Sequence, residues 1–407
     1  MKSSKNFKRG GVSIFIVMVV GVLISIMSAS FLRLMFRDQE QASKLDLSQS
    51  AYDSAQAGVE DAKRFLRIFR SACGASGTGS FEGVTYNCNA MRSAIQNESC
   101  YTLATAGIGN SNGETIIQTT SGAGGASNDA SLNQAYTCVK IRMNTSDFLG
   151  RTNDGSPSVI NLKGTTAFDR VRIRWHSREN MTNGNNISLD SLSNPSARPN
   201  INAQNWRNQN RPAILKAQFY GYVPGVGRSS SSMDTPYPDD GNGASEMLFY
   251  PTNSISALSS NVSNMPTVRR NESSSQATTD YTFTRCSDRM DANSNAYACE
   301  TTVNIGRSVS PNDVLYLRLT PLMNDSNFKV ELLNGNTIVD FAGVQPKVDS
   351  TGRANTQLRR VESRIGFNDT SFPVPLFSAQ TESNEEPICK DFSVTRLSNS
   401  NVNCRNQ

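Results

Sequence analysis

Two hydrophobic patterns follow each other at the start of the chain. No charged residue occurs from Gly10 to Leu32, and Val12–Leu32 reads VSIFIVMVVGVLISIMSASFL. At ~1.5 Å per residue this stretch extends roughly 31 Å as a helix, which is enough to cross the apolar core of a bilayer. The pattern therefore predicts a membrane-spanning helix over 12–32.

The second pattern is one-sided and predicts that the helix continues. Helix-forming residues run on to Arg70, no proline precedes Pro157, and Cys73-Gly74 opens a Gly/Ser cluster that ends the pattern. We expect one amphipathic helix over 33–72 that is continuous with the membrane span. Apolar or small residues recur along it in steps of three and four, which places them on one face: Leu45, Ser48, Tyr52, Ala55, Val59, Ala62, Leu66 and Phe69.

Beyond the helix the patterns change to those of loops and strands. Residues 73–156 are rich in Gly, Ser and Asn, which favours a loop region with cysteines, and 179–211 resembles a long exposed loop. Residues 157–407 carry alternating patterns that predict a β-rich globular body with mostly antiparallel pairing, since no regular alternation with helices occurs. The expected class is α+β. The strand candidates are 136–141, 170–176, 214–223, 247–250, 281–284, 314–319, 328–333, 337–341, 359–365 and 388–394.

All eight cysteines follow the apolar segment, and none forms a CxxC pair. An even number of cysteines on one side of a membrane-length segment is typical of disulfides formed outside the cytoplasm. Proximity in the sequence favours Cys286–Cys299 and Cys389–Cys404, while the pairing of the others stays open. Those others are Cys73, Cys88, Cys100 and Cys138.

Charge is concentrated at the N-terminus. The chain has 40 Lys+Arg and 35 Asp+Glu, and four of the basic residues precede Gly10 with no acid among them. Without those four the chain is nearly neutral, which disfavours a generally basic nucleic-acid-binding protein. The positive-inside rule leaves the N-terminus in the cytoplasm and the body outside a single-pass membrane segment.

Three features stand together at the N-terminus: the basic leader with Lys8, Arg9, Gly10 and Gly11, the uninterrupted span, and the Ala-rich segment AYDSAQAGVEDAK at 51–63. With these features the region resembles the type IV pilin-like proteins, and most closely minor pilins of the PilX type. The resemblance covers about the first 70 of 407 residues. It implies a leader over 1–11 that a prepilin peptidase removes by cutting after Gly10 or Gly11.

Further expectations follow from this resemblance. Most major pilins carry glutamate at the fifth mature position, where this chain has Phe15 or Ile16, depending on the cleavage site. The absence of this acid favours a minor pilin that primes, initiates or caps a filament over a repeating shaft subunit. The implied partners are other pilins, the inner-membrane assembly machinery and membrane lipid before assembly. A target on an external surface or DNA is a further expectation, and the final location is the pilus at the cell surface.

Two other readings of the N-terminus remain open. A secretory signal peptide could be cleaved near Ser28-Ala29-Ser30, which would release a secreted hydrolase that uses a pair of carboxylates. Alternatively, the segment could be an ordinary type II anchor of an ectodomain or surface receptor without any role in a filament.

The remaining chemistry is sparse, and we expect no enzyme and no cofactor. The chain has no HExxH or P-loop motif, and its one histidine, His176, falls on the apparently polar face of a predicted strand. Acidic turns at 239–243 and 291–295 offer oxygen ligands for calcium, but neither completes an EF-hand. Arg170, Arg172, Arg174 and Arg178 could form a cationic stripe for DNA, although pairing with acids or with solvent is the simpler expectation.

Overall fold

The structure is a computed structural model. The residues that it describes are 11–74, 76–111, 114–117, 134–182, 184–190, 203–224, 237, 241–253, 261–266, 282–290 and 296–366. The chain divides into two compact units. Unit 1 comprises Met1–Ile141 and Val348–Ser363, and unit 2 comprises Arg142–Lys347 and Arg364–Gln407.

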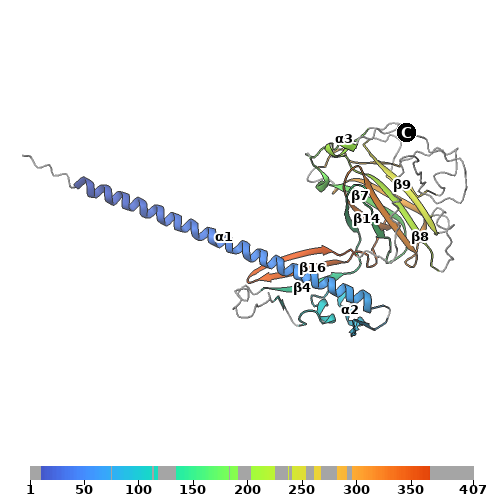
Figure 1. Ribbon diagram of the computed structural model, residues 1–407, viewed down its shortest axis with the longest axis horizontal. Coiled ribbons are helices and arrows are strands. Elements are labelled where there is room, and N and C mark those ends of the chain that lie inside the picture. The colour runs from blue at the N-terminus through green and yellow to red at the C-terminus, as the bar shows by residue number, and fades with distance from the viewer. Residues whose placement is uncertain are drawn as a thin grey trace, which may run out of the picture. The chain divides into compact units, whose positions relative to one another are not determined.

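Unit 1 begins with a single long helix, α1 (Gly11–Ala72), which Figure 1 shows without a break. Its 62 residues correspond to a length of about 93 Å. Because no proline or helix-breaking cluster interrupts residues 11–72, backbone hydrogen bonding can continue from the apolar segment into the amphipathic one. The continuous helix matches the one that the hydrophobic pattern predicts.

Short elements follow α1 in unit 1. A hairpin of β1 (Thr78–Phe81) and β2 (Val84–Asn87) leads into α2 (Cys88–Gln96) and then the 3₁₀ helix η1 (Thr102–Ala106). The side chain of Asn87 caps α2 by accepting a hydrogen bond from the Ala90 N–H at 3.0 Å. Residues 73–156, expected to be mainly loops, therefore contain ordered helices and strands.

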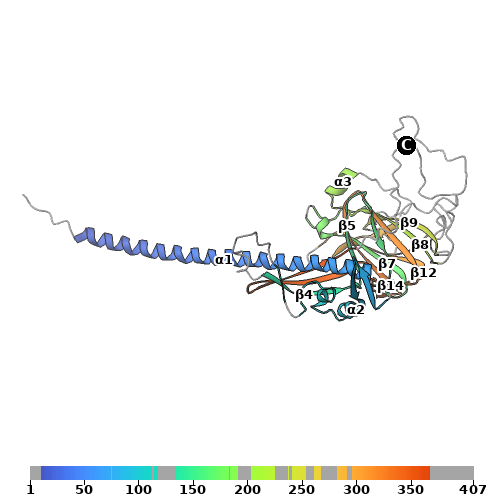
Figure 2. The ribbon, with the colours of Figure 1, turned by 60° about the horizontal axis from the view of Figure 1, so that its bottom comes forward.

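A four-stranded sheet completes unit 1, and its order is β17-β16-β4-β3. Figures 1 and 2 show the C-terminal half of α1 lying along β4 and β16. The sheet combines segments from the middle and the end of the described chain. Its strands are β3 (Thr115–Ile116), β4 (Gln134–Arg142), β16 (Lys347–Ala354) and β17 (Gln357–Arg364).

Unit 2 contains two further sheets. The six-stranded sheet has the order β10-β12-β7-β14-β15, with β5 also pairing with β14, and the five-stranded sheet has the order β11-β9-β8-β13-β6. Pairing is antiparallel except for β10 with β12 and β11 with β9. The strands of the six-stranded sheet are β5 (Phe148–Thr152), β7 (Phe168–Ser177), β10 (Val262–Asn264), β12 (Tyr297–Val309), β14 (Ser326–Asn334) and β15 (Thr337–Val339). Those of the five-stranded sheet are β6 (Ser158–Asn161), β8 (Ile214–Tyr222), β9 (Gly243–Thr252), β11 (Thr282–Arg285) and β13 (Val314–Leu322).

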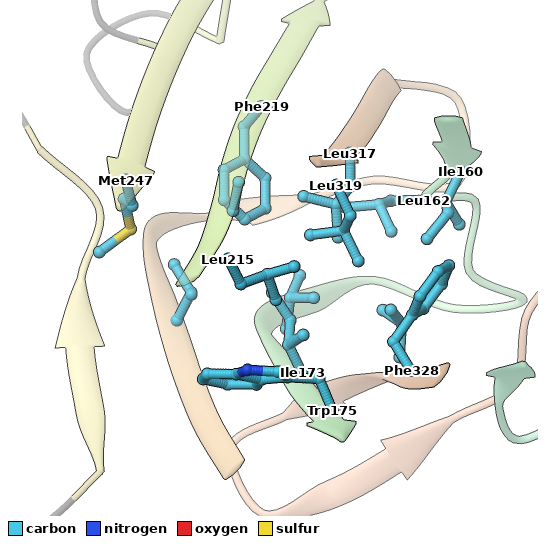
Figure 3. Packing of buried hydrophobic residues seen from close by; sticks show 14 of the residues in the cluster. Ile160, Leu162, Ile173, Trp175, Leu215, Phe219, Met247, Leu317, Leu319 and Phe328 are labelled. Atoms are coloured by element: carbon cyan, nitrogen blue, oxygen red, sulfur yellow. The ribbon is translucent and has the colours of Figure 1, made fainter. Parts of the chain in front are cut away.

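The two sheets of unit 2 share one hydrophobic core. Figure 3 shows Ile173 and Trp175 of β7 and Phe328 of β14 beside Leu215 and Phe219 of β8. Alternating side chains of each strand enter this core, as expected for a half-buried strand. The described part of the unit also includes two short helices, namely the 3₁₀ helix η3 (Arg178–Asn180) and α3 (Ala203–Asn208). The predicted hairpin at Asn334-Gly335-Asn336 is confirmed, because Asn334 pairs with Thr337.

Unit 2 is for the most part an insertion in unit 1. Its residues 142–347 lie in the chain between β4 and β16, and these two strands are neighbours in the sheet of unit 1. The predicted division into 73–156 and 157–407 does not coincide with this organisation. The boundary could not be read from composition because β16 and β17 have the same alternating patterns as the strands of unit 2.

Candidate functional site

The first half of α1 presents apolar side chains on all sides. Every large apolar residue between Phe15 and Phe36 is exposed, with Phe15 at 70%. Among the described residues, α1 is long and apolar enough to cross a membrane, and none of its most apolar stretch is buried within the chain. In water such a surface is unfavourable, so this half of α1 requires lipid or another apolar surface around it.

Two polar side chains within this apolar segment are satisfied inside the helix. Ser25 donates a hydrogen bond to the Gly21 carbonyl and Ser30 to the Ile26 carbonyl, each at 2.8 Å. Hydroxyls that bond to the preceding turn expose no unpaired donor to an apolar environment. At these two positions the segment is therefore compatible with burial in hydrocarbon.

The second half of α1 packs against the sheet of unit 1 through one face. Ala55, Val59, Ala62 and Leu66 of the predicted stripe are buried, and Ser48 and Phe69 are half-buried. The prediction was wrong for Leu45 and Tyr52, which are 72% and 41% exposed. The buried face also includes residues that the spacing did not select, namely Ala51, Ser54, Gly58, Phe65 and Ile68.

Close backbone approach explains which residues lie on this face. A Cβ on Gly352 of β16 would lie 2.2 Å from both the Ala51 carbonyl oxygen and the Ala55 nitrogen. A Cβ on Gly58 would lie 2.4 Å from the Ser350 Oγ. Only small residues fit where helix and strand approach so closely, so Ala51 occupies the contact and the bulky Tyr52 lies outside it.

Polar contacts also join α1 to the sheet. The Tyr136 hydroxyl donates a hydrogen bond to the Asp61 carboxylate at 2.8 Å, and the Arg359 Nε donates one to the Ser48 Oγ at 2.7 Å. Burial raises the pKa of Tyr136 to about 12, so its hydroxyl remains protonated and can donate at neutral pH. These bonds fix the helix in register on the strands.

Three disulfides cross-link the described residues. Cys73–Cys88 ties the end of α1 to the start of α2, Cys100–Cys138 joins the segment after α2 to β4, and Cys286–Cys299 lies in unit 2. The Cys286–Cys299 prediction is confirmed. Cys389 and Cys404, predicted to pair with each other, lie outside the described residues.

The expected leader lies mostly outside the described residues. Lys8, Arg9 and Gly10 are among those not described, and α1 begins at Gly11. Phe15 and Ile16, the alternatives for the fifth mature position, are both exposed on the apolar segment. Neither side chain can carry charge at that position.

Two arginines of the predicted stripe, Arg172 and Arg174 of β7, are paired with acids. The Arg172 Nε contacts Glu331 at 2.6 Å and the Arg174 Nε contacts Glu300 at 2.5 Å, while Lys329 lies 3.1 Å from Glu331. Arg172, Lys329 and Arg174 together keep the pKa of Glu331 below its usual value, despite the opposing effect of burial. Carboxylates therefore neutralise the stripe at Arg172 and Arg174.

His176 is not on a polar face, contrary to the prediction. Its side chain is fully buried, and its backbone φ is +64°, in the left-handed region. This irregular conformation ends the alternation of β7 and turns the ring inward. Burial lowers the pKa of His176 to about 4, an effect that the Asn210 backbone opposes in part.

The acidic turns proposed for calcium fall largely outside the described residues, since neither 238–240 nor 291–295 is described. Among the residues that are described, no three His, Cys, Asp or Glu side chains form a group that could hold a metal ion.

The sequence did not predict which residues of the sheet contact α1. Gly352, Ser350 and Tyr136 meet the helix from strands far away in the sequence, and a single sequence carries no signal of such pairings. Gly58 was detectable, because a glycine inside a strong helical pattern often marks close packing.

The chain matches no protein-family model, and no curated protein or solved structure is significantly similar to it. Its function must therefore be inferred from α1 and the two units themselves. Their described residues form a disulfide-containing α+β structure in which α1 is a candidate membrane-spanning helix.

Proposed function

We propose that this protein is a minor pilin-like subunit of a type IV pilus that is anchored in the membrane, and later in the filament, through α1. In this proposal a prepilin peptidase removes the basic leader after Gly10 or Gly11. The observation that carries the proposal is that one unbroken helix is fully exposed and apolar in its first half and packed against a sheet in its second.

The continuity of α1 supports assembly into a filament over simple anchoring. An anchor needs only to hold the body near the membrane, and a flexible linker would serve. A rigid helix fixed to its sheet at Gly352 and Asp61 transmits any displacement of the body directly to the apolar segment. Such a helix is suited to being drawn out of the bilayer together with the body.

The energetics require partners for this helix once it leaves lipid. An apolar surface on the order of 1,500–2,000 Å², transferred to water at ~25 cal/mol/Å², costs tens of kcal/mol. Packing against the equivalent helices of other pilins removes that cost. Small residues such as Gly21, Ser25 and Ser28 permit close approach between helices.

The insertion of unit 2 supports a division of roles between the units. Unit 1 contains α1 and the sheet against which it packs, so it is suited to assembly. Unit 2 has its own core between two sheets and can present a separate surface outside the cell. The lack of an acid at Phe15 or Ile16 favours a priming or tip position over a repeating shaft position.

The first experiment tests processing. N-terminal sequencing of the native protein should give a mature start directly after Gly10 or Gly11, and deletion of the prepilin peptidase should increase its apparent mass. A start near Phe31 would instead indicate signal-peptide cleavage. An intact Met1 with no change in mass would indicate an ordinary type II anchor.

A second experiment tests whether helix continuity matters. Gln41→Pro interrupts α1 at an exposed position between its two halves, where proline costs about 3 kcal/mol of helix stability and produces a kink. We expect Gln41→Pro to remain in the membrane but to be lost from sheared pili, while the matched control Gln41→Ala is retained in both. Equal recovery of both variants in pili would contradict the proposal.

A further inference from the structure

The face of α1 that the sheet of unit 1 leaves uncovered carries a stripe of charged side chains in a segregated order. Its members recur at intervals of seven residues, which is nearly two helical turns, and they are Asp46, Asp53, Glu60 and Arg67. All four are exposed, whereas Ala62 on the opposite face of the helix is buried. This charge stripe is therefore acidic towards the apolar half of α1 and basic at its other end.

Two ordinary causes of charge on a helix surface do not account for this order. The helix dipole acts within the first and last turn, whereas the acids of the stripe lie far from both ends of α1 (Gly11–Ala72). Ion pairs within a helix need opposite charges three or four residues apart. Among the ion pairs of the described residues, only that of Lys63 with Glu60, at 2.6 Å, involves the charge stripe.

Arg67 belongs to a basic group at the end of the charge stripe, together with the exposed Lys63 and Arg64. Lys63 and its partner Glu60 are 45% and 68% exposed, so their pairing contributes little free energy. Neither Arg64 nor Arg67 forms an ion pair with any of the described residues. The group therefore presents positive charge that the described part of the chain does not neutralise.

The charge stripe is complementary to a second copy of itself when the two copies are displaced along the helix axis. Copies in one membrane run parallel, because their basic N-termini stay on the same side. In register, Asp53 faces Asp53 and Arg67 faces Arg67, which is repulsive. A displacement equal to the interval between these residues, about 21 Å, brings Arg67 of one copy level with Asp53 of the other. Glu60 then faces Asp46, but Glu60 keeps Lys63 as its own partner.

We propose that the charge stripe of α1 binds a second copy of this protein that is parallel and displaced by about 21 Å along the helix. The inference rests on the proposed filament role, since an apolar span of about 31 Å cannot shift by this amount and still lie across the same bilayer. In the membrane, copies in register repel each other, and the contact forms when one copy has been drawn outward. At least two copies then lie next to each other in the filament.

Disulfide cross-linking in sheared pili tests the displacement. Two differently tagged full-length chains are produced together, one with Ala42→Cys and the other with Gln56→Cys. Both positions are exposed, and they are separated by the same interval as Asp53 and Arg67. We expect mild oxidation to join the two chains at least about fivefold more often than it joins two copies of the Ala42→Cys chain, which reports contact in register. A smaller preference would overturn the inference.

Charge exchange then tests the contact between Asp53 and Arg67. Arg67→Asp in the Gln56→Cys chain should reduce the mixed product by roughly fivefold, and Asp53→Arg in the Ala42→Cys chain should restore it. The matched control is Arg67→Asp in the Ala42→Cys chain, where Arg67 lies outside the contact and the product should not change. Equal losses from both placements, or no restoration, would contradict the inference.

The proposed filament role and this inference fail in different ways. Absence of the protein from sheared pili refutes the filament role and, with it, the displaced pair. Presence of both chains in pili without the mixed product refutes the displaced pair alone, and the neighbour of α1 in the filament is then a different subunit.

Discussion

Gly352 of β16 lies directly against Ala51 of α1, with no room for a side chain between them. A Cβ at Gly352 would be 2.2 Å from the Ala51 carbonyl oxygen, which belongs to a helix backbone that cannot move independently. This contact determines how closely the second half of α1 lies on its sheet.

Gly352→Ala should therefore separate helix and sheet in unit 1. Overpacking usually costs about 1–3 kcal/mol, and the upper end applies here because the obstacle is backbone. Thermal unfolding of the detergent-solubilised chain measures the loss. Gly366→Ala is the control, since a Cβ there meets nothing within 4 Å, and an equal effect of both substitutions would show that the close contact is unimportant.

Removal of the Cys73–Cys88 bridge should destabilise the junction between α1 and α2. The bond closes a loop with a sequence separation of 15, for which chain entropy predicts about 3 kcal/mol. Replacing Cys100 and Cys138, with a separation of 38, should cost about 4 kcal/mol. Paired Cys→Ser variants, compared by urea unfolding, check both values. No loss of stability in either double variant would contradict the prediction.

Acid should destabilise unit 2 through His176. The pKa of this group is about 4 in the folded protein and about 6.5 when unfolded, so the unfolded state binds the proton more tightly. The stability is complete above pH 6.5 and falls as the pH decreases towards 4, with a loss of about 2 kcal/mol at pH 5.

His176→Asn is the matched variant, because asparagine tolerates the left-handed backbone of this position and does not titrate. Chemical unfolding at pH 7.5 and pH 5 should show a smaller pH dependence for this variant than for the wild type. At pH 5 the contribution of Glu331 is still largely intact, because this pH lies above the usual glutamate pKa of about 4.3 and the folded pKa of Glu331 is lower still. An identical pH dependence of both proteins would exclude His176 as the source.

Glu331→Gln should destabilise unit 2 more than Glu300→Gln. The Glu331 side chain is 5% exposed and contacts Arg172, Arg174 and Lys329, whereas that of Glu300 is 45% exposed and contacts Arg174. Breaking a buried pair costs about 3–5 kcal/mol, and partial exposure of the cations reduces this to about 2–3 kcal/mol. The exposed pair should contribute less than about 1 kcal/mol. The comparison requires unfolding curves of the two variants under the same conditions, and the reverse order would refute it.

Local patterns predicted the elements of this protein better than their contacts. The length of α1, the hairpin at Asn334-Gly335-Asn336 and the Cys286–Cys299 bond all depend on residues close together in the sequence. The misplaced Leu45 and Tyr52 show the limit of such patterns. Steps of three and four define a helical stripe, but only the partner strand determines where on the helix that stripe is centred.

Of the contact between α1 and its sheet, only the helix residues were predictable from the sequence. The apolar segment is evident in the sequence, while Gly352 and Tyr136 reach α1 from strands on either side of a 200-residue insertion, about the length of residues 142–347. The buried ring of His176 was missed for another reason. Its left-handed backbone breaks the two-residue alternation from which its exposure was inferred.

The placement of most of unit 2, residues 142–347, between β4 and β16 means that the chain enters and leaves this part from adjoining strands. A protease that cuts only one of these two crossings cannot detach unit 2, because the other still tethers it. The same arrangement would allow the inserted domain to be lengthened, shortened or exchanged during evolution without a change in α1.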